Sequence, residues 1–210
     1  MTLDVETSAL LVVDVQYDFC PGGALGVPDG DAVIMPINRL ARRFRHIVAT
    51  QDWHPKDHIS FASNWPGKSP YEMVEADGIP QVLWPDHCVQ CSHGAEFHKH
   101  LTMNKASLIL RKGTHARLDS YSALFENDRR TPTGLDGWLR SFGIRTLFLT
   151  GLATDYCVYY SAIDAINLGY EPVVVMDAVR GVDVPAGNVA RTIDQMRAAG
   201  VRFVASGEIE

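Results

Sequence analysis

The fold is decided by one stretch of sequence, TLFLTGLATDYCVYYSAIDAINL, which covers residues 146–168. Its first five residues form an apolar run that is typical of a buried strand, and residues 156–168 have the apolar spacing of a helix. The stretch therefore predicts a strand that leads directly into a helix, with Cys157 in the first helical turn. Thr154 or Asp155 is placed to cap the N-terminus of that helix.

Apolar runs of the same kind recur along the chain. They are rich in Val, Ile and Leu without alternation, as expected for strands that are covered on both faces. With Thr146–Thr150 they are Ala9–Val15, His46–Thr50, Ser107–Leu110, Pro172–Met176 and Val201–Ala205. Helical patterns separate most of them, at Ala32–Phe44, Leu135–Phe142, Tyr156–Leu168 and Val189–Ala199. This alternation predicts an α/β fold of three layers, α/β/α, with a six-stranded parallel sheet in a single domain over residues 1–210.

The composition limits the classes of partner. The chain has 210 residues, is 46% hydrophobic and carries a net charge of -6. The acidic balance and the lack of a basic run argue against nucleic acid as a partner, and no apolar stretch approaches the roughly 20 residues that span a membrane. The acidic start, Met1–Glu6, does not fit a secretory signal, so we expect a cytoplasmic protein with four reduced cysteines. Homo-oligomer formation stays open at this point.

Chemically capable residues follow several of the predicted strands. Asp14, Asp52, Lys112 and Cys157 each lie at or just after a strand end. Taken singly, they are explained by a turn cap, a solvated strand end or a small cysteine that packs a helix on a sheet. In an open parallel sheet, however, ligands bind outside the carboxyl ends of the strands. Four such residues at one edge therefore predict a site.

Cys157 is the candidate nucleophile of this site. The unpaired N–H groups and the partial positive charge of a helix N-terminus favour its thiolate. Asp14 is placed to take the thiol proton and later pass it to a leaving amine, while Lys112 offsets the negative charge. Backbone N–H groups of Cys157 and the preceding turn are placed to receive a developing oxyanion. These residues predict acyl transfer on an amide.

A second group of residues has the chemistry of metal ligands. Asp52 and His54 are two apart at a strand end, so their side chains point the same way. With His87 from the long connection they form a carboxylate and imidazole set suited to Zn, Fe or Mn. His58 is a fourth ligand, a residue just outside the ligands that supports them, or a solvated loop residue. We favour the supporting residue outside the ligands. Residues 51–105 show no clear strand, so we expect a long metal-binding and substrate-binding loop region at 52–105.

The pair Cys88 and Cys91 forms a C-x-x-C motif. Such a motif occurs in redox pairs and as half of a zinc site. The chain has no second copy, and this one does not open a helix after a strand. We therefore favour structural or incidental thiols.

Several motifs in one order make the chain resemble the nicotinamidase group of the isochorismatase-like cysteine hydrolases. They are Leu11–Phe19, Pro21–Leu25, Asp52–Pro55, His58–Ala62, Trp84–Cys88, Lys112–Thr114, Asp119–Ala123, Gly151–Val158 and Asp177–Val182. The resemblance implies hydrolysis of nicotinamide to nicotinate and ammonia through a cysteine thioester, which would feed NAD salvage. Whether pyrazinamide is also a substrate stays open at this point. The resemblance also implies a cis peptide bond before Ala153.

The same resemblance implies a role for each matching residue. The triad maps onto Asp14, Lys112 and Cys157, and the oxyanion hole onto the N–H groups of Ala153 and Cys157. One divalent metal ion, Zn in preference to Fe or Mn, maps onto Asp52, His54 and His87, with His58 and Ser60 just outside the ligands. The pyridine ring maps onto Phe19, Trp84, Tyr121 and Tyr156.

Other functions remain as alternatives. The nearest is a metal-free cysteine hydrolase of the same fold that acts on N-carbamoyl or ureido compounds. A redox or metal-storage protein would instead use the C-x-x-C motif and the histidines of the long connection. A plain interaction protein gives no reason for Asp14, Lys112 and Cys157 to converge.

Overall fold

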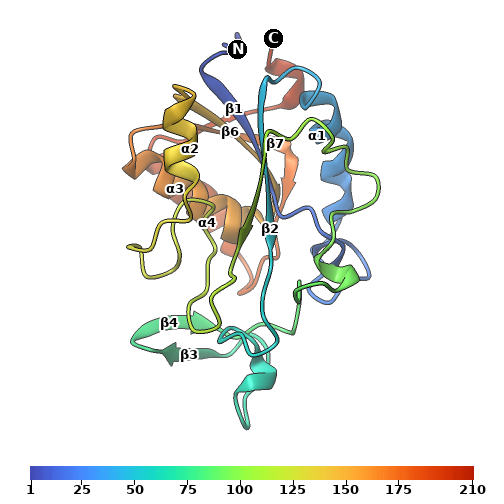
Figure 1. Cartoon of the computed structure of the whole chain (residues 1–210), viewed down its shortest axis with the longest axis vertical. Helices are drawn as coiled ribbons and strands as arrows, with labels where there is room; N and C mark the ends of the chain where they lie inside the picture. Colours follow the sequence, from blue (N-terminus) through green and yellow to red (C-terminus); the bar gives the residue numbers. More distant parts are fainter.

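The structure is a computed structural model that describes all 210 residues (Figure 1). Its strands are β1 (Ser8–Val13), β2 (His46–Asp52), β3 (Met73–Ala76), β4 (Ile79–Val82), β5 (Leu108–Lys112), β6 (Thr146–Leu152), β7 (Glu171–Arg180) and β8 (Arg202–Val204). Its α-helices are α1 (Ile34–Leu40), α2 (Leu135–Ser141), α3 (Tyr159–Asn167) and α4 (Asn188–Ala198). None of these helices combines the length and the apolarity needed to cross a bilayer.

Six strands form the parallel sheet that the sequence predicts. Their order is β5-β2-β1-β6-β7-β8, and every neighbouring pair is parallel. β1 lies between β2 and β6, so the chain leaves β1 in one direction and later returns on its other side. Such a reversal opens a crevice at the carboxyl ends of the central strands, where α/β proteins bind ligands.

Helices cover both faces of the sheet, and the residues of β1 explain why. Leu10 and Val12 pack into the core shared with α1, whereas Leu11 and Val13 pack into the core shared with α2, α3 and α4. Alternate strand residues face opposite sides, so an unbroken apolar run needs both sides covered. The ribbon shows α1 on one side of the sheet and α2 to α4 on the other (Figure 1). Each such buried side chain contributes about 1.5–3 kcal/mol.

Two elements, α1 and β7, differ most in length from their predictions. Helix α1 is shorter than the predicted 32–44, because a 3-10 turn over Gly30–Val33 precedes it and the N–H groups of Arg42 and Arg43 bond three residues back. Strand β7 is longer than the predicted 172–176, and its pairing with β6 shifts between Leu149 and Gly151. This irregularity lets β7 continue to the site edge.

The prediction of no strand in residues 51–105 is wrong. Strands β3 and β4 form an antiparallel hairpin at the lower end of the molecule in Figure 1. The turn residues Asp77 and Gly78 have φ values of 51° and 82°. Both values are positive, as a two-residue hairpin turn of this hand requires, and Asp-Gly is the sequence signal for it.

One glycine brings the ends of β1 and β6 together. Gly151 has φ of 100°, and a Cβ there would lie 2.0 Å from the carbonyl oxygen of Val13. No other residue fits that approach without moving the backbone. The close contact places Asp14, which follows β1, beside the turn that carries Cys157.

Candidate active site

The three residues of the predicted triad meet at the carboxyl edge of the sheet. The ammonium nitrogen of Lys112 lies 2.9 Å from an oxygen of Asp14 and 3.4 Å from the sulfur of Cys157. Exposure is 0% for Asp14, 2% for Lys112 and 5% for Cys157, so water screens these contacts little. The arrangement is that of a nucleophile and a proton acceptor held by one cation.

Neighbouring strands fix the orientation of Asp14 and Lys112. Asp14 has φ of 48°, and its carboxylate accepts a hydrogen bond from the hydroxyl of Thr50 at 2.5 Å. The backbone N–H of Asp14 donates to the hydroxyl oxygen of Thr50 at 3.2 Å. Lys112 is the last residue of β5 and also donates to the carbonyl oxygen of Ser120 at 3.0 Å and to Asp52. These contacts, together with the ion pair between Lys112 and Asp14, offset much of the cost of burying the two charges.

Burial dominates the ionisation of the triad. It raises the pKa of Asp14 in spite of the opposing Lys112 ammonium. It also raises the pKa of the Cys157 thiol well above its usual value, with Lys112 lowering it and both Asp14 and Asp52 raising it further. Burial alone would lower the pKa of Lys112, but these carboxylates raise it well above its usual value.

The helix N-terminus, which by itself favours the thiolate of Cys157, therefore does not set the pKa of this thiol alone. Burial and two nearby carboxylates raise the pKa of the thiol and outweigh the favourable helix end. Cys157 lies in a turn of π-helix, Thr154–Val158, that leads into α3. Neither predicted cap bonds to that turn, because Ala153 is the N-cap residue and Asp155 turns to another segment. The peptide bond before Ala153 is cis, as the resemblance implies.

The predicted metal ligands converge beside the triad. One potential ligand atom from each of Asp52, His54 and His87 lies within 4.8 Å of the other two, and all three residues are buried. The Nδ1 atoms of the two imidazoles bond to carbonyl oxygens, His54 to Gly113 at 2.9 Å and His87 to Pro85 at 2.7 Å. Both Nε2 atoms consequently face the Asp52 carboxylate, at 3.5 and 3.9 Å. Carbonyl partners of this kind orient metal-binding histidines.

The electrostatics of this group also fit a cation. Burial opposes ionisation of Asp52, but Lys112 and His54 outweigh it and hold the pKa of Asp52 well below its usual range. Burial and the neighbouring His54 lower the pKa of His87 to about 4, so its imidazole is neutral near pH 7, as a ligand must be. The donor set of one carboxylate and two imidazoles suits a divalent transition metal.

His58 and Ser60 lie next to the ligand group, as the sequence predicts. The Nδ1 of His58 lies 2.7 Å from the hydroxyl of Ser60, and its Nε2 is buried without a partner. His58 belongs to a second potential ligand group with His54 and Asp119 rather than to the group of Asp52 and His87. Burial lowers the pKa of His58 to about 4, so a neutral imidazole with one free nitrogen faces the metal-binding region.

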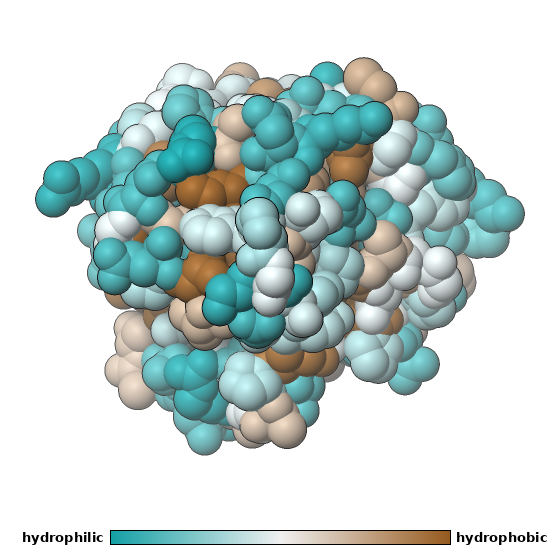
Figure 2. Space-filling model, turned by 90° about the horizontal axis from the view of Figure 1, so that it is seen from below, coloured by the Kyte–Doolittle hydropathy of each residue, from teal (hydrophilic) through white to brown (hydrophobic).

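A small apolar cavity of about 30 Å³ opens onto the triad sulfur. It is lined by Phe19, Leu25, Asp52, Trp84, His87, Tyr121, Ala153, Tyr156, Cys157 and Val182. The four predicted ring-binding aromatics are all among them. The Trp84 and Tyr156 rings are 4.8 Å apart and nearly perpendicular, and the indole N–H of Trp84 donates to the Tyr121 hydroxyl at 3.1 Å. Seen from the end that carries β3 and β4, apolar side chains appear in hollows framed by hydrophilic ones (Figure 2).

Sequence reasoning missed three residues of this cavity and its wall. Leu25 and Val182 line it, and each ends one of the motifs that carry the family resemblance, which was the available signal. Gln81 on β4 donates to the Tyr121 hydroxyl at 3.2 Å and to Asp119 at 2.9 Å. No local pattern marks Gln81, since its role depends on where the hairpin docks.

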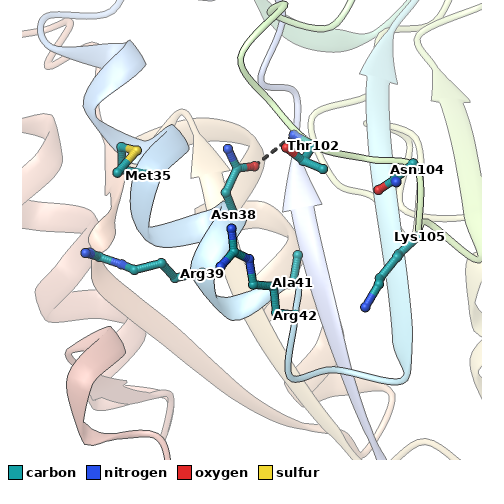
Figure 3. Close-up of a pocket in the computed structure, with 8 residues that line it drawn as sticks. All are labelled: Met35, Asn38, Arg39, Ala41, Arg42, Thr102, Asn104 and Lys105. Carbon is teal, nitrogen blue, oxygen red and sulfur yellow. Dashed lines mark hydrogen bonds between the residues drawn. The ribbon is translucent and has the colours of Figure 1, made fainter.

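A larger hollow, of about 450 Å³, lies away from the triad (Figure 3). It is formed by α1 and the segment before β5, with Asn38 accepting a hydrogen bond from the Thr102 N–H at 2.8 Å. None of the predicted site residues lines it. Size alone therefore does not identify the reactive cavity, whereas the buried ionisable groups do.

The C-x-x-C motif lies beside the site but does not form a disulfide. Cys88 is buried and Cys91 is exposed, and both are free thiols. Burial and the carboxylates of Asp52 and Asp18 raise the pKa of Cys88 well above its usual value. Cys88 therefore lacks the lowered pKa of a redox nucleophile.

The fold and the site together define a class, that of three-layer α/β proteins with a buried aspartate, lysine and cysteine at the carboxyl edge of a parallel sheet. This chain belongs to the isochorismatase family, because the family model described as the isochorismatase domain matches residues 8–208.

Proteins of known activity resemble the chain over nearly its whole length. The nicotinamidase of Acinetobacter baylyi is 48% identical over 201 residues, which cover 96% of this chain and 94% of the relative. A structure of a nicotinamidase/pyrazinamidase from Acinetobacter baumannii has a TM-score of 0.96 and 48% identity, covering 98% of this chain and 99% of that one. A Pyrococcus horikoshii pyrazinamidase solved in complex with zinc is 37% identical with a TM-score of 0.77, covering 95% and 99%.

Proposed function

We propose that this chain hydrolyses nicotinamide to nicotinate and ammonia, with Cys157 as the nucleophile. The observation that carries the proposal is the position of the Lys112 ammonium, within 2.9 Å of Asp14 and 3.4 Å of the Cys157 sulfur. The full-length similarity to nicotinamidases supports the choice of substrate. The reaction supplies nicotinate, the acid that NAD salvage consumes, and pyrazinamide is a second substrate of the same shape.

Proton movement between Cys157 and Asp14 drives the first half of the reaction. Asp14 takes the thiol proton while the sulfur attacks the carboxamide carbon, and the N–H groups of Ala153 and Cys157 receive the charge on the oxygen. The proton on Asp14 then passes to the leaving nitrogen, which departs as ammonia. A thioester between Cys157 and the nicotinoyl group remains.

Water completes the reaction. Asp14, again a carboxylate, takes a proton from the attacking water, and the bond between the carbonyl carbon and the sulfur breaks. Asp14 returns this proton to the Cys157 sulfur, and the product acid leaves and loses its own proton to the solvent, which gives nicotinate. Lys112 keeps both groups in place and limits the cost of the buried carboxylate throughout.

Asp52, His54 and His87 would hold one divalent metal ion, with Zn²⁺ favoured over iron or manganese. When bound, the ion would supply a positive charge that holds the pyridine nitrogen. His58 and Ser60 lie outside the ligands and are hydrogen-bonded to each other. Phe19, Trp84, Tyr121 and Tyr156 bind the ring through its faces and edges.

The proposal is tested by measuring ammonia release from nicotinamide with wild-type protein, with and without a chelator. Cys157→Ala should abolish turnover while metal content stays unchanged. Cys20→Ala is the matched control, because Cys20 is also buried and its pKa is raised to about 11, yet it lies outside the cavity. Acid quenching of the wild type should trap a nicotinoyl group on the peptide that contains Cys157. Turnover by Cys157→Ala would refute the assignment.

Two measurements distinguish the proposed function from the alternative, a metal-free hydrolase that acts on N-carbamoyl or ureido compounds. Purified protein should contain about one metal ion per chain, as expected for one three-ligand site. Ammonia release should be faster from nicotinamide than from an N-carbamoyl amino acid. Protein that carries no metal and prefers the N-carbamoyl compound would favour the alternative.

A further inference from the structure

The carboxylate of Asp155 joins the turn that carries Cys157 to the segment after β7. It accepts hydrogen bonds from the N–H groups of Val182 at 2.9 Å and Asp183 at 3.0 Å, and from the side-chain amide of Asn188 at 3.0 Å. Asp155 is only 2% exposed. A buried carboxylate with three donors is held rigidly, because losing any one donor leaves part of its charge unpaired.

A second contact and one glycine reinforce this attachment. The Tyr156 hydroxyl donates to the carbonyl oxygen of Val184 at 2.6 Å. A Cβ at Gly181 would lie 2.9 Å from Oδ1 of Asp155 and 2.3 Å from Val189, so a side chain there would push the segment away. Adjacent residues of the nucleophile's turn therefore bind the segment on both sides of Asp183.

The attached segment supplies one wall of the substrate cavity. Val182 lines the cavity together with Phe19, Trp84 and Tyr156. It is the only cavity residue from the segment after β7. Asp155 itself does not line the cavity, so its effect on substrate passes through Val182.

We propose that Val182 is a specificity-determining residue that limits substituents on the pyridine ring, and that Asp155 is the positioning residue that holds Val182 in place. The inference rests on the proposed hydrolysis of nicotinamide and concerns the ring rather than the carboxamide. A branched side chain fixed at the cavity wall excludes an added methyl group, because a tightly held wall cannot yield at low cost. One methyl group in an apolar pocket is worth about 10–200-fold in discrimination.

The test compares nicotinamide with 5-methylnicotinamide and 6-methylnicotinamide. Val182→Ala should raise the ratio of kcat/KM for at least one methylated amide to that for nicotinamide by about 10-fold. Asp155→Asn should raise the same ratio and should raise KM for nicotinamide by more than it lowers kcat, because the amide NH₂ cannot accept the bonds that the carboxylate accepts. Asn188→Ala, which removes one donor, should have a milder effect in the same direction and replaces Asp155→Asn if that variant does not fold.

Asp177→Asn is the matched control. Its carboxylate also accepts two hydrogen bonds, from the N–H and hydroxyl of Ser206 at 2.7 and 2.5 Å, but it lies outside the cavity. That variant should leave the ratio unchanged. Unchanged ratios in Val182→Ala, or equal kcat losses on all amides at constant KM in Asp155→Asn and Asn188→Ala, would overturn the inference. Wild-type turnover of nicotinamide in the same assay reports separately on the proposed function.

Discussion

Lys112 lies between Cys157 and Asp14, with its ammonium nitrogen 3.4 Å from the sulfur and 2.9 Å from a carboxylate oxygen. A third side chain, that of Asp52, connects the same ammonium to the metal-binding group. One buried ammonium thus balances the carboxylates of Asp14 and Asp52 and also contacts the thiol of Cys157, which loses its proton during the reaction. Because the two carboxylates are almost completely buried, removing the cation leaves charge with no solvent to stabilise it.

Lys112→Met is therefore expected to damage both activity and stability. We expect kcat/KM for nicotinamide to fall by at least about 10²–10³-fold, and the free energy of unfolding to fall by about 3–5 kcal/mol. Ammonia release and denaturant unfolding measure the two effects. Lys68→Met is the control, because Lys68 pairs with Glu72 at an exposed position and should change stability by less than about 0.5 kcal/mol. Near-native activity in Lys112→Met would contradict the triad.

The acid side of the pH profile should report on Asp14. This residue must be a carboxylate to take the thiol proton, and burial raises its pKa. Activity is therefore present above the raised pKa and is lost as the pH falls through it, at a higher pH than for an exposed aspartate. Measuring kcat/KM from about pH 4 to 8 gives the midpoint. Metal content is determined at each pH, and a flat profile with metal retained would be inconsistent with this role.

Gly113→Ala should weaken metal binding without replacing any of the ligand residues. Gly113 has φ of 62°, and a Cβ there would lie 2.4 Å from Cε1 of His54. The displaced imidazole should lower metal affinity by about 10–100-fold. Gly78→Ala carries a similar backbone cost, since its φ is 82°, but its Cβ meets nothing within 4 Å. Competition with a chelating dye measures the metal affinity of each variant. Equal affinities in Gly113→Ala and Gly78→Ala would contradict the expected displacement of His54.

Cys91 should be the thiol that reacts first with a disulfide reagent at about pH 8, because it alone of the four cysteines is exposed. Burial raises the pKa of Cys20 to about 11 and that of Cys88 well above its usual value, which slows both. Cys91→Ser should remove the fast phase and leave ammonia release unchanged. Loss of turnover in Cys91→Ser would instead restore the redox interpretation of the C-x-x-C motif.

Local patterns were sufficient for much of the fold. The apolar runs around residues 9–13 and 146–150 predict strands covered on both faces, and the structure confirms the six-stranded parallel sheet. The hairpin of β3 and β4 was missed although Asp77 and Gly78 carry its signal, because the flanking residues are only partly buried and give no apolar run. Short elements held by tertiary docking leave weak patterns in the sequence.

The candidate site divides in a similar way. The convergence of Asp14, Lys112 and Cys157 follows from topology, because carboxyl ends of parallel strands share one edge. The ionisation of Cys157 does not follow from its place near a helix end, since two carboxylates from distant strands and the loss of water decide it. The partners of Asp155 were equally hidden, because they come from the segment after β7 rather than from its own helix.

Sequence by itself determined which residue types stand at the strand ends, and so the class of chemistry that this protein performs. Tertiary structure alone decided the distances between them, the exclusion of water around Lys112, and the closing of the cavity by Val182. The physical reason is that strand formation and residue order depend on neighbours along the chain. Burial, electrostatic balance and cavity shape depend on groups brought together from far apart in the sequence, and their energies exist only once the sheet has formed.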